Sequence, residues 1–166
     1  MKIKGDAIVL TGGKFNSKSA KTAHGLLRGS KRFKIRAVID KSLEGKFIKI
    51  DKNGKIDIVL NKTEIPVFTD LKSFLKSNIK VDFCVIGVAS AGGLLPNDMR
   101  ADVILSLKNK ISIVNGLHSI LSEDNELKKI SLKYNSNIYD IRRSKPRKKL
   151  SFWSGKIYEV SSKKIV

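Results

Sequence analysis

The sequence has little cysteine and histidine, and these shortages exclude two kinds of stabilising scaffold. Cys84 is the one cysteine among 166 residues, so the chain cannot form an internal disulfide. With the two histidines, His24 and His118, it supplies too few ligands for a structural zinc site. The fold must therefore rest on a hydrophobic core, and one domain of this length is large enough to bury one.

Long hydrophobic runs are also missing. The most apolar stretch, Phe83–Ala89, is far shorter than the roughly 18 residues of a membrane span. The amino terminus, Met1–Gly5, has no apolar core of the kind found in secretion signals. Hydrophobic residues make up 41% of the chain and charged residues 30%, which is a globular composition. We therefore expect a cytoplasmic protein with no membrane partner.

Acidic residues are scarce, with 15 against 34 lysines and arginines, so the formal net charge is +19. The excess lies in the first half and the last quarter of the chain, whereas residues 81–120 are neutral. Such a field attracts phosphates on nucleic acid, on a membrane surface or on a cofactor. No aromatic ladder, zinc finger or helix-turn-helix pattern accompanies the charge, so nucleic acid is the less favoured partner. A small anionic ligand is the favoured one.

Apolar, strand-like runs alternate with helix-like segments along the chain. This rhythm predicts an α/β fold, a Rossmann-like doubly wound sheet that is mostly parallel and six-stranded, with helices on both faces. The expected strands are at 7–10, 35–40, 65–68, 83–89, 112–115 and 138–141, and the expected helices at 19–28, 71–77, 97–108 and 124–134.

Two segments interrupt this rhythm. Alternating apolar and polar residues flank Asn53-Gly54, which predicts an exposed β-hairpin inserted at about 46–60. Six of the eight residues from Arg142 to Lys149 are basic, which is typical of an exposed linker. We therefore assign residues 1–143 to the Rossmann-like domain. Residues 144–166 are expected to be a basic linker and short strands that lead to a C-terminal domain absent from this chain.

Three glycine-bearing turns follow the first, fourth and fifth core strands. They are Gly12-Gly13, the loop Ala89–Pro96 with Gly92 and Gly93, and Gly116–His118. Ligands bind beyond the carboxyl ends of the strands in open parallel sheets, and glycine lets a backbone approach an anion closely. These turns therefore predict a site for a phosphate-bearing ligand.

Charged residues near these turns are candidate ligand contacts. Lys14, Lys18 and Lys21 lie in or just after the first turn. Asp40 ends the second strand, where dinucleotide-binding folds place the acid that holds a ribose hydroxyl. The first turn does not contain G-x-G-x-x-G, and Lys21-Thr22 lacks the glycines of a phosphate loop. A bound dinucleotide of the NAD(P) type and a purely structural turn both remain open.

Few groups could act as catalysts. His118 follows the fifth strand at the rim of the predicted cleft and is a candidate general acid or base. His24, on the first helix, is either a second candidate or a locally bonded structural residue. Cys84 alternates within a buried strand and is expected to be inert, and Ser90 lies outside any nucleophile elbow. No catalytic triad can be assembled.

Several of these segments together resemble the N-terminal Rossmann-like domain of the D-glutamate N-acetyltransferase family, formerly a family of unknown function. The segments are Ala20–Arg28, Ala37–Asp40, Ile65–Phe68, Ile86–Pro96 and Gly116–His118. The resemblance implies a P-loop-type C-terminal domain after this one, and transfer of acetyl from acetyl-CoA to the amino group of D-glutamate. It also implies that this chain alone is inactive or incomplete, and a homo-oligomer is expected.

The resemblance, together with the turns and charges described above, singles out a set of positions for testing. Cofactor-binding positions are expected at Gly12, Gly13, Lys18, Lys21, Thr22, Asp40, Ala89, Gly92, Gly93 and Arg142. His118 is the catalytic candidate, and no metal ligand is expected. The hairpin around Asn53-Gly54 departs from the family pattern. A stand-alone NAD(P)-binding module is the alternative function, and a basic nucleic-acid-binding protein is the less favoured one.

Overall fold

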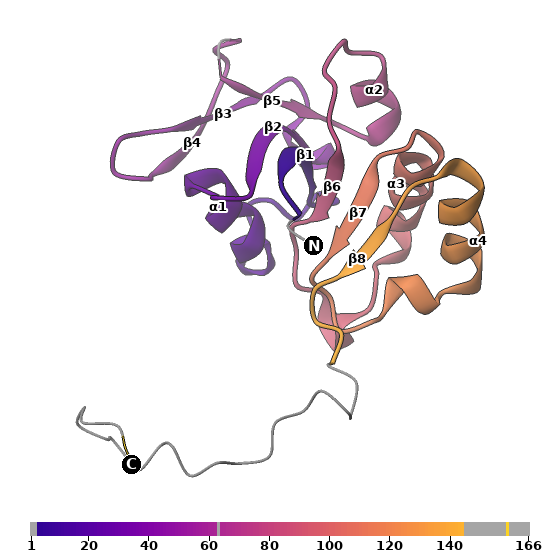
Figure 1. The fold of residues 1–166 in the computed structure, drawn as a ribbon. Coiled ribbons are helices and arrows are strands. Elements are labelled where there is room, and N and C mark those ends of the chain that lie inside the picture. The colour runs from indigo at the N-terminus through magenta and orange to yellow at the C-terminus, as the bar shows by residue number, and fades with distance from the viewer. Residues whose placement is uncertain (1–2, 63, 145–158, 160–166) are drawn as a thin grey trace.

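The structure is a computed structural model and describes residues 3–62, 64–144 and 159. An eight-stranded sheet forms its centre, in the order β4-β3-β5-β2-β1-β6-β7-β8 (Figure 1). The strands are β1 Gly5–Leu10, β2 Phe33–Ile39, β3 Phe47–Ile50, β4 Ile56–Val59, β5 Ile65–Phe68, β6 Phe83–Ile86, β7 Ser112–Asn115 and β8 Ile138–Asp140. The expected short strands after residue 150 and most of the expected basic linker lie outside the described residues.

Six strands of this sheet are parallel, which is the arrangement that the alternating rhythm predicts. They run β5-β2-β1-β6-β7-β8, the strand order of the dinucleotide-binding folds. The chain moves outward from β1 to β2 and β5, then returns to the other side of β1 with β6, β7 and β8. The Rossmann-like α/β class is therefore confirmed.

The predicted number of six strands is wrong, because the hairpin joins the sheet instead of standing apart from it. Its strands β3 and β4 pair antiparallel with each other, and β3 pairs antiparallel with β5. Ile48 of β3 is completely buried, so the expectation of an exposed hairpin holds only for its outer strand. Pro66 of β5 lies opposite Phe47 of β3. Its missing N–H group costs no hydrogen bond to β3, because the neighbouring pair, Lys46 and Val67, is the bonded one.

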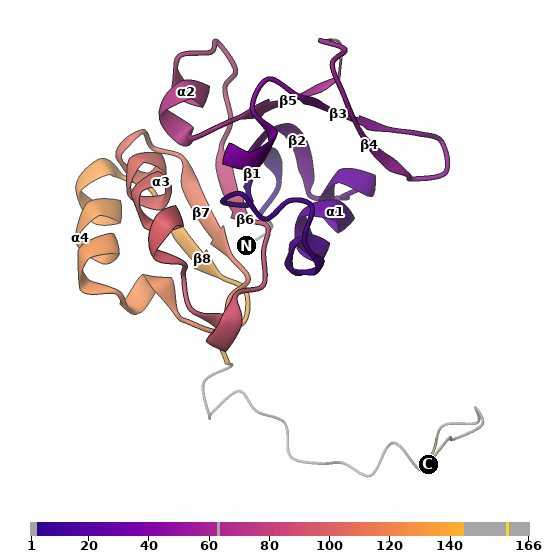
Figure 2. The same cartoon turned by 180° about the vertical axis from the view of Figure 1, so that it is seen from behind.

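Four α-helices connect the strands: α1 Lys21–Arg28, α2 Leu71–Leu75, α3 Asn97–Lys108 and α4 Asn125–Tyr134. Short 3-10 turns accompany them: η1 Lys18–Ala20, η2 Lys41–Leu43, η3 Ala91–Gly93 and η4 Leu121–Glu123. Helix α3 packs against both α2 and α4 and lies across β7 and β8 (Figure 2). Helix α1 contacts the opposite face, where Ala23 packs against Gly87, on which a Cβ would lie 2.9 Å from Cβ of Ala23.

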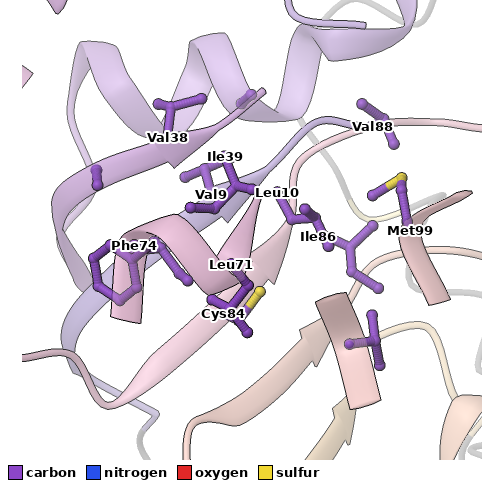
Figure 3. Close-up of a cluster of buried hydrophobic side chains, with 14 of the residues drawn as sticks. Val9, Leu10, Val38, Ile39, Leu71, Phe74, Cys84, Ile86, Val88 and Met99 are labelled. Atoms are coloured by element: carbon purple, nitrogen blue, oxygen red, sulfur yellow. The ribbon is translucent and has the colours of Figure 1, made fainter. Parts of the chain in front are cut away.

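The main core is formed by the sheet together with buried side chains of all four helices. Figure 3 shows Leu71, Phe74 and Met99 of these helices beside Cys84 and Ile86 of β6. All five side chains are almost fully buried.

Candidate functional site

The three glycine turns come together at the carboxyl edge of the sheet, at the point where the strand order reverses. The N–H of Ala89, after β6, donates to the C=O of Ser19 at 2.8 Å, which ties this loop to the start of α1. The N–H of Ser119, after β7, donates to the C=O of Gly93 at 2.9 Å. Loops that follow three separate strands therefore form one connected rim.

The first turn needs both of its glycines. Gly12 and Gly13 have φ of +59° and +85°, which favour residues without a Cβ. A Cβ on Gly12 would lie 2.7 Å from Cγ of Met99, and one on Gly13 would lie 3.0 Å from Cε of Lys41. The space above this turn is therefore already filled by side chains of α3 and η2.

Asp40 holds this turn from below. Its Oδ2 accepts hydrogen bonds from Thr11 Oγ1 at 2.6 Å and from the Phe15 N–H at 2.9 Å. Its Oδ1 accepts from the N–H of Ser42 at 2.9 Å and from the Ser42 hydroxyl. The residue is fully buried, so both carboxylate oxygens are used within the protein. Asp40 therefore fixes the conformation of the turn at the rim, and its effect on a bound ligand would be exerted through the position of that turn.

His118 is the centre of the rim on the other side. A Cβ on Gly93 would lie 2.5 Å from Cβ of His118, so this glycine makes room for the histidine. Arg142, just after β8, places Nη1 at 3.2 Å from Nε2 of His118. A guanidinium has no acceptor, so Nε2 accepts and the proton of the neutral ring lies on Nδ1. Both side chains are exposed, and they form a small polar cluster open to solvent.

A buried amide and a carboxylate support this cluster from within the fold. Asn115 Nδ2 donates to the C=O of Ser119 and to Oδ1 of Asp140, both at 2.7 Å. Asp140 also accepts from the N–H groups of Leu121 at 2.9 Å and Ser122 at 3.0 Å. Burial alone would raise the pKa of Asp140, but the hydrogen bonds from Asn115 and Ser122 outweigh it and hold this pKa below its usual value. Sequence analysis did not single out either residue, although both polar side chains close apolar strands.

Three residues predicted to contact the ligand, at the start of the first helical region, are exposed to solvent. Lys18 lies in η1, and Lys21 and Thr22 open α1. Within the described residues, neither lysine takes part in an ion pair. The N–H of Ala23, one turn into this region, donates to the C=O of Gly87 at 2.9 Å. The lysines therefore offer free positive charge beside the rim, while part of the helix N-terminus is already occupied.

A comparison with protein-family models identifies the family to which this chain belongs. The family described as "Domain of unknown function (DUF1611_N) Rossmann-like domain" matches residues 51–144, which are more than half of the chain. The chain belongs to the DUF1611_N family. A curated protein from a Pseudoalteromonas species, named D-glutamate N-acetyltransferase, is 33% identical over 82 residues. These residues are 49% of this chain and 24% of that protein.

A solved structure extends the similarity to nearly the whole chain. A DUF1611 family protein from Anabaena variabilis matches with a TM-score of 0.73 and 26% sequence identity. The match covers 94% of this chain and 42% of the other. The resemblance found in the sequence is thus confirmed, and this DUF1611_N chain spans less than half the length of either relative.

The remaining candidates in this DUF1611_N domain have structural surroundings. His24 Nε2 lies 2.9 Å from the C=O of Phe15, and the two rings meet edge to face with centroids 4.8 Å apart. Burial raises the pKa of the Cys84 thiol to about 12, which keeps it protonated and unreactive. The Ser90 hydroxyl donates to the C=O of Leu94. Among the described helices, none is long and apolar enough to cross a membrane.

Surface hollows of this DUF1611_N domain also occur far from the rim. One of about 470 Å³ lies at the amino edge, beside Gly5, Leu27 and Arg32. Another of about 480 Å³ lies between Phe74 and Asn109, at the same edge. At the rim, side chains of Met99, Lys41 and His118 fill the space above Gly12, Gly13 and Gly93. The rim is therefore a polar, cationic surface, and a hollow of about 260 Å³ beside it is lined by Ser122, Asp140 and Arg143.

Proposed function

We propose that this domain is the amino-terminal part of an acyl-CoA-dependent N-acetyltransferase that acts on D-glutamate or a similar amino acid in the cytoplasm. The observation that carries the proposal is the 33% identity, over 82 residues, to a protein named D-glutamate N-acetyltransferase. The rim adds a chemical argument, because exposed cations suit an acceptor with two carboxylates and a donor with phosphates. Lys18, Lys21 and Arg142 are the cations that we assign to these anions.

The reaction needs one base at the rim. The amino nitrogen of the acceptor attacks the thioester carbonyl of acetyl-CoA, a C–N bond forms and the C–S bond breaks. The base removes the proton that the amine loses, and the departing thiolate takes up a proton. We assign the base to His118. Its Nε2 accepts from Arg142, so a substrate carboxylate that attracts Arg142 would free Nε2 for the amine.

A second domain completes the site in this proposal. The relatives are longer than this chain, and Met99, Lys41 and His118 occupy the space above the rim glycines. A P-loop-type domain placed against the rim would supply the remaining walls and the phosphate loop that this sequence lacks. We therefore expect the isolated chain to bind acetyl-CoA and D-glutamate weakly and to be inactive.

Calorimetric titration of acetyl-CoA and D-glutamate tests the proposal in this chain and in a version that carries the family's second domain. The two-domain protein should bind both compounds and form N-acetyl-D-glutamate. Arg142→Gln should weaken D-glutamate binding by roughly tenfold or more, because a charge-assisted contact is lost. Arg143→Gln is the matched control, since Arg143 is engaged by Glu123 at 2.9 Å. If the two-domain protein binds neither compound, the proposal is wrong.

The strand order favours one second candidate, a stand-alone NAD(P)-binding module. The parallel strands follow the dinucleotide-binding order, and the Gly12-Gly13 turn follows its first strand. A bound nicotinamide nucleotide would stabilise the folded state by mass action and raise the melting temperature of this chain. An unchanged melting curve at saturating NAD(P) would eliminate this candidate without affecting the first.

A further inference from the structure

The outer strand of the sheet, β4, leaves apolar side chains uncovered. Ile58 is 38% exposed, and Leu60, directly after the strand, is 71% exposed. β4 packs mainly against β3. In both ribbon views α1 is the element below the hairpin, and its Arg28 Nε donates to the C=O of Gly54 at 3.0 Å, in the turn that precedes β4 (Figures 1 and 2). An uncovered strand of this kind is a template for pairing with another chain.

The backbone hydrogen-bond pattern of the hairpin shows which groups of β4 face outward. The N–H of Asp51 donates to the C=O of Lys55 at 3.0 Å, which makes this a hydrogen-bonded pair. Bonded and non-bonded pairs alternate in an antiparallel ladder, so Lys49–Asp57 and Phe47–Val59 are the next bonded pairs. The N–H and C=O groups at positions 56, 58 and 60 therefore point away from β3.

The side chains at these positions continue the core of the molecule. Ile58 lies opposite Ile48, and Ile56 opposite Ile50. Opposite residues of a ladder share one face of the sheet, and Ile48 is completely buried. Ile56, Ile58 and Leu60 therefore extend a buried apolar layer up to an open edge.

We propose that two copies of this chain pair through their β4 strands, antiparallel, about a two-fold axis at Ile58. In this register Ile58 lies opposite its own copy, and Ile56 lies opposite Leu60. The outward N–H and C=O groups at 56, 58 and 60 then all find partners. The two sheets become one continuous sheet, and the apolar layers join across the axis.

The charges along the strand are compatible with this register. Asp57 lies opposite Val59 of the other copy, so no two like charges stand directly opposite each other. Lys55 Nζ is already paired with Asp57 in its own strand at 2.9 Å. A second copy is therefore the occupant that satisfies the hydrogen bonds, the apolar contacts and the local charges together. Since both copies carry +19, added salt should tighten the dimer.

Sedimentation of this chain over the micromolar range tests the dimer. The unaltered chain should dimerise, and Ile58→Lys should raise the dissociation constant by roughly 100-fold, since it places two like charges opposite each other. Leu132→Lys is the matched control, because Leu132 is 74% exposed on α4 and should leave the constant unchanged. A chain that stays monomeric at every concentration and salt level would overturn the proposal.

Disulfide trapping tests the register. Cα atoms of a hydrogen-bonded antiparallel pair lie about 5.5 Å apart, within the range of a disulfide. Ile58→Cys should therefore cross-link on mild oxidation, while Leu60→Cys should not, because it faces Ile56. The double variant Ile56→Cys/Leu60→Cys should cross-link again, and buried Cys84 should not interfere. A dimer in which Ile58→Cys cross-links no better than Leu60→Cys uses another surface, and the proposal would then be rejected.

Discussion

Asp40 and Asp140 perform the same task at two places on the carboxyl edge. Each ends or directly follows a strand, and each binds the turn that follows the neighbouring strand. Asp40 holds the Thr11–Phe15 turn after β1, and Asp140 holds the Leu121–Ser122 segment after β7. A buried carboxylate that accepts hydrogen bonds from several N–H and O–H groups fixes the loop strongly. If the loop moved, each of these buried donors would lose its acceptor, which costs free energy.

Asp40→Asn should test this task. The amide has one oxygen and one NH₂ group, so it would point donors at N–H groups that now donate to Asp40. We expect the free energy of unfolding in urea to fall by about 2–3 kcal/mol, the cost of unsatisfied buried donors. Asp98→Asn is the control. Its surface ion pair with Lys41 at 3.0 Å should be worth less than about 1 kcal/mol. Equal effects of the two substitutions would contradict a special role for Asp40.

Asp140 and Asp102 should make opposite contributions to the pH dependence of the free energy of unfolding. The pKa of Asp140 is lowered by its hydrogen bonds, which prevail over burial, so its contribution to stability is present above the unfolded pKa near 4 and lost as pH falls through the folded value. Burial raises the pKa of Asp102, so its contribution is present at low pH and lost as pH rises through the folded value.

Unfolding free energies between about pH 3 and pH 7 check this contrast. Relative to the unaltered chain, Asp140→Asn should become more destabilising as pH rises. Asp102→Asn should become less destabilising over the same interval, since the amide carries no charge to bury. Its Oδ1 could still accept from the Leu71 N–H, now 2.9 Å from the carboxylate. Parallel pH trends for the two variants would contradict the assigned pKa directions.

On the scale of elements, the loops after β6, β7 and β8 are packed as one unit around His118. Gly93 and Gly92 are adjacent, with φ of +67° and +64°, but their surroundings differ. A Cβ on Gly93 would overlap His118, whereas the nearest atom to a Cβ on Gly92 is Cγ of Leu94 at 3.9 Å. Substitutions at the two glycines therefore distinguish the cost of backbone strain, which both would carry, from the cost of disturbed loop packing, which arises only at Gly93.

Gly92→Ala and Gly93→Ala should differ for this reason. Gly92→Ala carries the strain of a positive φ and should cost about 1 kcal/mol. Gly93→Ala carries that strain and a clash with His118, and should cost about 2–4 kcal/mol. Urea unfolding measures both, and the NMR shifts of the His118 ring should move far more in Gly93→Ala. Equal costs and unmoved ring signals would show that the loops do not pack on Gly93.

The sequence predicts these elements better than the way they associate. Alternation around Asn53-Gly54 identifies the hairpin, but it cannot say that the face of the hairpin carrying Ile48 becomes buried. That depends on the pairing of β3 with β5, across a connection that leaves no local pattern. The sequence predicts Asp40 as a ligand contact, and it cannot show the donors Thr11, Phe15 and Ser42, which meet the carboxylate only after folding. The ligand contacts themselves stay predictions.

On the scale of the whole molecule, the net charge of +19 works against compactness. Six ion pairs are found within the described residues, too few to balance the excess of lysine and arginine. The strongest is a cluster in which Arg100 binds Asp124 at 2.9 Å and Glu126 at 2.6 Å, joining α3 to α4. Most cations therefore remain in solvent, where they repel one another.

Sodium chloride should raise the melting temperature by several degrees between low and moderate ionic strength, because it screens this repulsion. Differential scanning fluorimetry at matched ionic strength checks the cause. Chloride and a bulkier monovalent anion should act alike if screening dominates. A large extra gain with phosphate would indicate a bound anion, and Lys21→Gln should then reduce that gain. A melting temperature that falls with salt would contradict the argument.

The central position of β1 also affects how the chain is made. β1 is synthesised before both of its neighbours in the sheet, and β2 follows within forty residues, but its other neighbour is β6, at Phe83–Ile86. Until β6 has been synthesised, one side of a strand whose last four residues, Ala7–Leu10, are apolar and buried in the fold has no partner. Nascent chains with such an open strand are prone to associate with each other, so this is the stage of biosynthesis at which chaperones should matter most.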